Sequence, residues 1–166
     1  MTITKGVDVY TTVAEVDALF AVTIYNDTWS GLTVTEKEEY IRSATMELDT
    51  LSWVGMVVDE SQPLAFPRTG EYVDKVRGMT IPMDPTPKAI ENACAYQAFS
   101  LISSKSDLIG SSSSDAESIK IGELEITGMG GGSSSNTRKN SNLSPMVKNI
   151  IRPMISKGNT PWWRAN

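Results

Sequence analysis

The stretch that decides the fold is "TPKAIENACAYQAFSLI", residues 86–102, which has the features of a helix buried along one face. Thr86 can cap the helix, and Pro87 suits its first turn because the amide hydrogen that proline lacks would have no partner there. The apolar positions recur at helical spacing: Ile90, Ala93, Cys94, Ala98 and Leu101. We therefore expect a central helix here, followed by a polar loop over residues 103–114.

Two further helices are expected upstream, and each begins with a capping box. The first box is "TVAE", Thr12 to Glu15, and the second is "TEKE", Thr35 to Glu38, which opens a helix running to about Leu51. Residues 26–31 are expected to form the loop between them. The apolar stripes are Val13, Val16, Leu19 and Phe20 in the first helix, and Ile41, Ala44, Leu48 and Leu51 in the second.

No helical period survives between residues 52 and 86, where four prolines and three glycines interrupt the chain. Long irregular segments in compact domains are usually functional or packed down by their own side chains. In "QPLAFPR", residues 62–68, prolines on both sides favour an extended path that lays Phe66 onto the helices. We expect Arg68 to pair with an acidic residue of the body.

Downstream, "ESIKIGELEIT", residues 117–127, predicts a β-hairpin with a two-residue turn at Gly122-Glu123. That turn places Ile121 opposite Leu124, Ile119 opposite Ile126 and Lys120 opposite Glu125. One face of the hairpin is then apolar and the other carries an ion pair. The apolar face is expected to lie on the body or on a neighbouring subunit.

The organisation that we expect is a body over residues 1–128, a Gly/Ser-rich linker over 129–143 and an extended C-terminal docking arm over 144–166. Ser144 and Pro145 begin a short helix in the arm, which Pro153 stops or kinks. Tryptophan and arginine are enriched where partners bind most tightly. The residues predicted to bind a partner are Met146, Val147, Ile150, Ile151, Met154, Pro161, Trp162, Trp163 and Arg164.

The net charge of −5 conceals a sharp division along the chain. All 20 acidic residues and 9 of the 15 basic residues lie at or before Glu125, so this part carries a net charge of −11. The remaining six basic residues follow Glu125 with no acidic residue among them. Such asymmetry indicates an acidic body and a separate basic interaction tail.

Composition excludes several classes of chemistry. The chain has no histidine and one cysteine, which removes intramolecular disulfides, Ser-His and Cys-His pairs, and Cys₂His₂ or His₃ zinc sites. Cys94 is expected to be a core residue. "GMGGGSSS" lacks the lysine of a phosphate-binding loop. We therefore expect a protein that is not an enzyme and has no cofactor or metal. No apolar run is long enough for a bilayer and no signal peptide is evident, so we expect a soluble cytosolic product without a membrane partner.

Two functions from other classes stay open as alternatives. Basic residues interleaved with tryptophan, as in "RKNSN" and "WWR", are typical of single-stranded-DNA binding. The acidic body and the adjacency of the two tryptophans argue against it. A cell-wall hydrolase would need a pair of carboxylates, and no pair stands out.

The stretches "LDTLSWVGMVVDESQPLAFPRTG", residues 48–70, and "IPMDPTPKAIENACAYQAFSLI", residues 81–102, carry a family resemblance. They resemble the head–tail adaptor (head completion, or connector) family of tailed bacteriophages, and the similarity extends over residues 8–104. Its most specific residues are Gln62, Pro63, Leu64, Phe66, Pro67 and Arg68. Some relatives are described as primosomal or single-stranded-DNA-binding proteins, which makes that function the alternative.

The resemblance implies a mainly α fold, a small helical bundle with a β-hairpin, in a structural virion protein at the head–tail junction. Such adaptors are assembled in the host cytoplasm as a ring of about twelve copies beneath the portal protein. The expected partners are the portal protein, neighbouring copies, a tail or nozzle protein, and double-stranded DNA that passes through the channel without specific binding. An acidic channel wall would repel DNA and let it slide.

Overall fold

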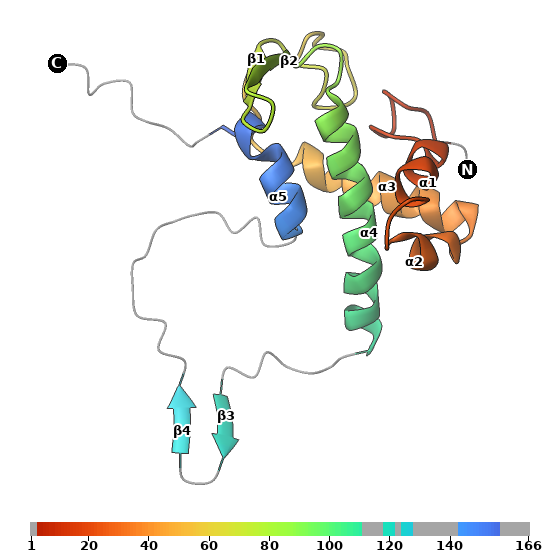
Figure 1. The fold of residues 1–166 in the computed structure, drawn as a ribbon, viewed down its shortest axis with the longest axis vertical. Helices are drawn as coiled ribbons and strands as arrows, with labels where there is room; N and C mark the ends of the chain where they lie inside the picture. The colour runs from red at the N-terminus through yellow and green to blue at the C-terminus, as the bar shows by residue number, and fades with distance from the viewer. Residues whose placement is uncertain (1–2, 111–117, 122–123, 128–142, 157–166) are drawn as a thin grey trace, which may run out of the picture.

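A computed structural model describes residues 3–110, 118–121, 124–127 and 143–156. Helix α4 (Lys88–Gly110) runs through the body. Helix α3 (Val34–Asp49) crosses it, α1 (Val13–Phe20) and α2 (Asn26–Ser30) lie on one side, and α5 (Pro145–Ile151) lies on the other (Figure 1). The other described elements are strands β1 (Glu71–Asp74), β2 (Met79–Pro82), β3 (Ser118–Ile121) and β4 (Leu124–Thr127), and the 3₁₀ helix η1 (Arg152–Met154). The expected mainly α bundle with a β-hairpin is confirmed.

Helix α4 begins at Lys88, one residue later than predicted, with the Pro87 carbonyl accepting from the Ile90 amide, and it is longer than expected. Residues 103–110 continue the helix, so the predicted loop was wrong over that range. No proline or glycine interrupts the sequence between Lys88 and Gly110. Serine costs a helix only about 0.5 kcal/mol relative to alanine, so the polar composition of this part does not end it.

The capping box of α1 is confirmed. The Thr12 hydroxyl accepts from the Glu15 amide at 3.3 Å, and the Glu15 carboxylate accepts from the Thr12 amide at 2.9 Å. Helix α3 uses Thr33 and Glu36 in the same way, two residues before the predicted box. The stretch "TVTEKE", residues 33–38, contains the Thr-x-x-Glu spacing twice, so the sequence alone does not separate the two starts.

Helix α2 occupies residues that were expected to form a loop. Its Trp29 side chain is buried, and the indole Nε1 donates to Asp17 Oδ1 at 2.6 Å. Lys37 Nζ reaches the same carboxylate oxygen at 2.9 Å and lies 5.7 Å from the centroid of the Trp29 ring. Five residues are too few to show a helical period, so this element depends on tertiary contacts.

The core forms where small residues of α4 meet α3. Ala93, Cys94 and Ala98 are fully buried, as is Ala44 on the facing helix. The Thr45 hydroxyl donates to the Ile41 carbonyl and lies 3.3 Å from Cys94 Sγ. Burial raises the pKa of the Cys94 thiol to about 12. Cys94 is therefore a core residue, as predicted, and not a nucleophile.

The irregular segment before β1 is packed down by its own side chains. The Phe66 ring is buried and meets the Trp53 ring edge-on, with centroids 4.9 Å apart. Gln62 holds the segment together, because its Nε2 donates to the carbonyls of Leu64 at 2.6 Å and Pro67 at 3.0 Å. Phe66 thus belongs to the core of the body, and its ring contacts are with Trp53 and Tyr10, which lie outside the helices.

Arg68 does not pair with an acidic residue, and that expectation was wrong. Its guanidinium donates to the carbonyls of Val54 at 2.9 Å, Ala65 at 3.1 Å and Gly55 at 2.5 Å. These carbonyls belong to an irregular backbone that has few amide partners of its own, so the planar donors of arginine satisfy them instead.

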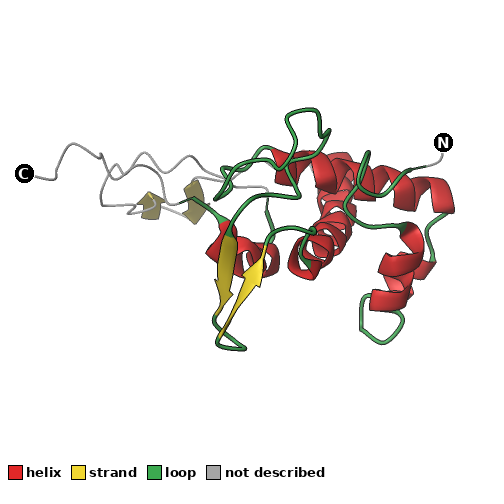
Figure 2. Ribbon diagram, turned by 90° about the horizontal axis from the view of Figure 1, so that it is seen from above, coloured by secondary structure: helices red, strands yellow, loops and turns green. Residues whose placement is uncertain are grey.

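Strands β1 and β2 form a hairpin inside the stretch for which no secondary structure was predicted (Figure 2). Tyr72 pairs with Ile81 and Asp74 with Met79. The connecting turn ends at Gly78, whose φ of +65° is a conformation that favours glycine. Four-residue strands beside prolines give too short an alternation to be recognised in sequence.

Strands β3 and β4 confirm the predicted register of the downstream hairpin. Ile121 pairs with Leu124, Lys120 with Glu125 and Ile119 with Ile126. The predicted turn at Gly122-Glu123 lies outside the described residues. The predicted linker at 129–143 also lies outside them, except for Leu143, which is buried.

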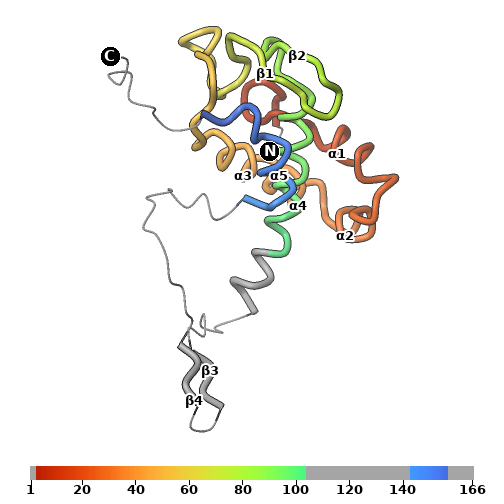
Figure 3. Tube along the Cα trace, turned by 60° about the vertical axis from the view of Figure 1, so that its left-hand side comes forward, coloured from red at the N-terminus to blue at the C-terminus, as the bar shows by residue number. Residues whose placement is uncertain are grey.

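The described part of the expected arm is joined to the body. The Ser144 hydroxyl caps α5 as predicted, accepting from the Val147 amide at 3.2 Å, and α5 packs against α4 (Figure 3). Beyond α5, the Val54 amide donates to the Met154 carbonyl at 2.9 Å and the Ser156 amide donates to the Ser52 carbonyl at 2.8 Å. Residues 143–156 thus complete the core. None of the described helices is both long and apolar enough to cross a bilayer.

Candidate functional site

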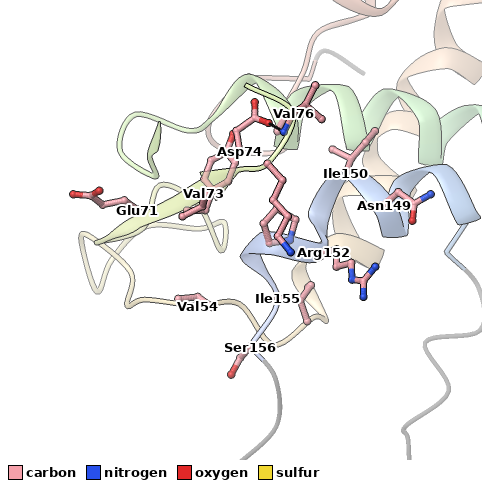
Figure 4. Close-up of a pocket in the computed structure, with 14 residues that line it drawn as sticks. Val54, Glu71, Val73, Asp74, Val76, Asn149, Ile150, Arg152, Ile155 and Ser156 are labelled. Carbon is pink, nitrogen blue, oxygen red and sulfur yellow. Dashed lines mark hydrogen bonds between the residues drawn. The ribbon is translucent and has the colours of Figure 1, made fainter. Parts of the chain in front are cut away.

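A cleft of about 850 Å³ lies between β1 with its turn and the α5–η1 segment (Figure 4). Its walls come from parts of the chain that are about 80 residues apart in sequence. The apolar and aromatic lining residues are Val54, Tyr72, Val73, Val76, Ala89, Ile150, Pro153 and Ile155. The charged lining residues are Glu71, Asp74, Lys75 and Arg152.

The alternation of side chains along β1 and the helical period of α5 determine which side chains face the cleft. In β1, Tyr72 is only 8% exposed, whereas its neighbour Val73 is 54% exposed. In α5, Val147 and Ile151 point into the core. The opposite helix face therefore presents Lys148, Asn149 and Arg152 to solvent.

Three basic side chains in or next to this cleft have no acidic partner among the residues that the structure describes. Lys75 and Arg152 line the cleft, and Lys148 lies one helical turn before Arg152 on the exposed face of α5. Three other lysines form ion pairs: Lys5 with Glu15 and Glu91, Lys37 with Asp17, and Lys88 with Glu91. The cleft is thus a place where cationic groups are available to a ligand.

The two acidic residues of the cleft differ in their surroundings. The Asp74 carboxylate accepts from the amides of Val76 at 2.9 Å and Arg77 at 3.3 Å, and Arg77 Nε lies 3.8 Å from it. Glu71 is exposed and has no ion pair within the described ranges. Figure 4 shows Glu71 at the end of the cleft away from Asn149 and Arg152. Among the lining residues of the cleft, the negative charge without an ion pair in the described ranges is therefore that of Glu71, at one end of the cleft.

The structure separates the residues that were predicted to bind a partner. Val147, Ile151 and Met154 are buried in the chain's own core, because α5 packs on α4, so this stripe is not a free docking surface. Ile150 lines the cleft, and Met146 is 41% exposed with its Sδ 3.9 Å from the Tyr25 hydroxyl. Pro161, Trp162, Trp163 and Arg164 lie outside the described residues.

The reactive groups of the described part do not form a catalytic arrangement at the cleft. Tyr10, Asp49 and the Ala65 amide meet instead beneath the irregular segment, where the Tyr10 hydroxyl donates to Asp49. Burial raises the pKa of Asp49, and these hydrogen bonds offset that effect only in part. The cleft itself offers two basic side chains, two carboxylates, one carboxamide and apolar surface, and its Lys75 and Arg152 can contact an anionic ligand.

Sequence reasoning missed Lys75 and the cleft as a whole. The only local signal was "DKVRG", residues 74–78, a short basic stretch next to a glycine. Its meaning depends on α5, which lies some 70 residues later, so no local pattern could place Lys75 beside Arg152.

A protein-family model described as "Putative DnaT-like ssDNA binding protein" matches residues 2–165 of the chain. No curated protein and no solved structure matches it significantly. The match covers nearly the whole sequence, including the tail that the adaptor resemblance did not reach.

This match overturns the expectation of a phage head–tail adaptor. The assignment to that family, the virion function, and the portal, tail and ring partners are corrected together, because they rested on the resemblance of residues 8–104. The match also contradicts passage of double-stranded DNA without binding. It agrees instead with the alternative, single-stranded-DNA binding, which the acidic body had argued against.

Proposed function

Because the chain belongs to the DnaT-like ssDNA-binding family, we propose that it binds single-stranded DNA in the cleft between β1 and α5. One observation carries the location: Lys75 and Arg152 line this cleft, and Lys148 is exposed one helical turn before Arg152, all without acidic partners in the described part of the chain. The family match suggests single-stranded DNA as the ligand, and the cleft is the binding site that we propose for it.

The phosphates are the groups that these side chains would hold. Lys148 in α5 and Arg152 at the end of that helix are four residues apart and both exposed, and Lys75 lies in the turn after β1 on the opposite wall. A strand passing between the walls meets cations from both sides. Arginine can hold one phosphate with two hydrogen bonds, whereas lysine acts as a point charge.

The bases would lie on the apolar lining, chiefly Val73, Ile150 and Pro153. Tyr72 also lines the cleft, but its low exposure leaves little ring surface for stacking. Stacking on aromatic side chains supplies about 1–3 kcal/mol per base in single-strand-binding proteins, so binding here depends more on the phosphates. We therefore expect weak sequence preference and strong salt dependence.

The rest of the body restricts where DNA can bind. Residues 1–125 carry a net charge of −11, and three of their basic residues, Lys5, Lys37 and Lys88, form ion pairs within the protein. A polyanion is repelled by such a surface. The surface around Lys75, Lys148 and Arg152 thereby becomes the favoured location, and the acidity that argued against binding acts to localise it. We propose that the protein acts by binding DNA and is not an enzyme.

The test is fluorescence anisotropy of a labelled oligothymidylate, measured over a range of salt concentrations. Lys75→Ala, Lys148→Ala and Arg152→Ala should each weaken binding severalfold. Each should also reduce the slope of log K against log salt by about 0.7, the value for one phosphate contact to a single strand.

The matched control is Lys88→Ala. Lys88 is 67% exposed at its side chain and lies at the start of α4, but its Nζ contacts Glu91 at 2.7 Å and does not line the cleft. This variant should bind like the unmodified protein. Equal losses in all four variants would show that net charge alone matters, and no binding at low salt would refute the proposed function.

A further inference from the structure

We infer that residues 157–166 of the same chain occupy this cleft in the absence of DNA, with a tryptophan of Trp162-Trp163 on its apolar lining. The chain passes directly from the cleft into this segment, since Ile155 and Ser156 are lining residues and the Ser156 amide is fixed to the Ser52 carbonyl. Only the part of the inference that concerns competition with DNA rests on the proposed function.

The cleft leaves apolar surface uncovered within the described residues. Val73 is 54% exposed, Val76 is 96% exposed and Val54 is 39% exposed, although all three line one concavity. A buried tryptophan covers about 150–250 Å² of surface, which is enough to span several such side chains. An apolar concavity next to a segment with two adjacent tryptophans thus has a suitable occupant in the same chain.

The segment is also long enough to reach. Trp162 is six residues beyond Ser156, which corresponds to at most about 20 Å of extended chain. That reach covers a cleft whose lining begins at Ser156 itself. Because the occupant is tethered, its effective concentration at the cleft is in the millimolar range, so even a weak contact would be populated.

The charges of the segment and of the cleft are complementary. Lys157 precedes the tryptophans and Arg164 follows them, with no acidic side chain between residues 157 and 166. Glu71 stands exposed at one end of the cleft without an ion pair in the described part. A cation on either side of the tryptophans can reach this carboxylate, and the pairing would orient the segment along the cleft.

This placement makes the segment a competitor of single-stranded DNA. The same walls would hold either the tryptophan or the bases, and DNA must displace the segment to bind. If the segment fills the cleft about nine-tenths of the time, its removal raises the apparent affinity for DNA about tenfold.

The first experiment needs no DNA. The full chain is labelled with 5-fluorotryptophan, and its four ¹⁹F resonances are assigned with Trp162→Phe and Trp163→Phe. The solvent isotope shift between H₂O and D₂O then reports the exposure of each ring. We expect at least one tail tryptophan to have a clearly smaller isotope shift than in concentrated urea. Full exposure of both would overturn the inference.

A matched pair of variants locates the contact. Val73→Glu places a charge on the cleft lining and should expose the shielded tryptophan. Val22→Glu alters a 90% exposed valine in the loop between α1 and α2 and should leave it shielded. Unchanged resonances of buried Trp29 and Trp53 show that each variant is folded. A tryptophan that stays shielded in Val73→Glu is docked elsewhere, which would exclude this cleft.

The competition is measured by oligothymidylate binding to the Trp162→Ala/Trp163→Ala variant. Tighter binding than in the unmodified chain, by up to about tenfold, is expected from an emptied cleft. Weaker binding would mean that the tryptophans contact the DNA, and it would overturn the competition. If neither chain binds DNA, the proposed function fails, whereas the fluorine result still decides whether the segment occupies the cleft.

Discussion

At the scale of single residues, Glu15 connects the N-terminal segment to α1 and α4. Its carboxylate closes the capping box of α1 and also contacts Lys5 Nζ at 2.5 Å, and Lys5 in turn contacts Glu91 at 2.7 Å. Burial disfavours the ionised carboxylate, but the hydrogen bonds from Lys5 and Thr12 outweigh it and lower the pKa of Glu15 to about 2.

The lowered pKa predicts a pH-dependent stability. Ionised Glu15 stabilises the fold above its ordinary pKa of 4.5, and this contribution is lost as the pH falls from there towards about 2. Glu15→Gln keeps the capping geometry and removes the charge. It should lower the free energy of unfolding by up to about 1 kcal/mol at pH 7 and change it little near pH 2.

The measurement is urea unfolding at both pH values. The control is Glu39→Gln, which removes an exposed carboxylate on α3 that has no ion pair in the described part of the chain. A loss in Glu15→Gln that is the same at both pH values would show that the charge does not matter.

Residue-level features differ in how well the sequence predicts them. The Thr12-Glu15 box was predictable because both partners are three residues apart. The partners of Arg68 were not, because its carbonyl acceptors are set by how residues 54, 55 and 65 fold back on one another.

At the scale of elements, α5 shows how a correct local prediction can mislead about role. Its cap, first residue and apolar stripe were all recognised in the sequence. Amphipathicity shows only that one face needs cover, however, and it does not say whether a partner or the chain itself supplies that cover. In the structure, α4 covers Val147 and Ile151.

Helix α5 is therefore expected to contribute to the stability of the whole body. Ile151→Ala should lower the free energy of unfolding by about 2–4 kcal/mol, because it removes a side chain that is only 2% exposed. Urea unfolding followed by far-UV circular dichroism checks this. Met146→Ala, at a 41% exposed position on the same helix, is the control and should have a much smaller effect. A negligible loss in Ile151→Ala would show that α5 is dispensable to the body.

The short elements were the ones that the sequence did not reveal. Helix α2 has five residues and strands β1 and β2 have four each, which gives no more than two periods of the matching pattern. They are held by side chains from elsewhere, such as Asp17 and Lys37 around Trp29. Since β1 forms one wall of the cleft, missing the hairpin also meant missing the candidate site.

At the scale of the whole molecule, charge is separated in space as well as in sequence. The basic C-terminal part of the chain contributes Arg152 to a cleft in an otherwise acidic body, with Lys148 next to it, and Lys75 lines the other wall. The sequence predicted this division, but it did not show that the two parts share a surface. The acidic and the basic part of the chain meet at the cleft because residues 52–54 are hydrogen-bonded to residues 154–156.

Glu71, the exposed acidic residue at the cleft, leads to a prediction of tighter DNA binding. Glu71→Gln removes a negative charge that opposes DNA, so it should raise the affinity for oligothymidylate about threefold, the effect expected of a single exposed charge. Anisotropy at low salt measures this. Glu39→Gln makes the same change in net charge on α3, away from the cleft, and should have less effect. Equal gains from both would assign the effect to overall charge.

The bridge between Trp53 and Ile155 has a consequence for how the protein is synthesised. Translation delivers α1 to α4 before α5, so the nascent chain carries an uncovered strip of α4 while it is still on the ribosome. The body cannot close until residue 156 has emerged from the exit tunnel. Pairings across such a separation form late and slowly, and the waiting apolar strip is where a chaperone would first engage the chain.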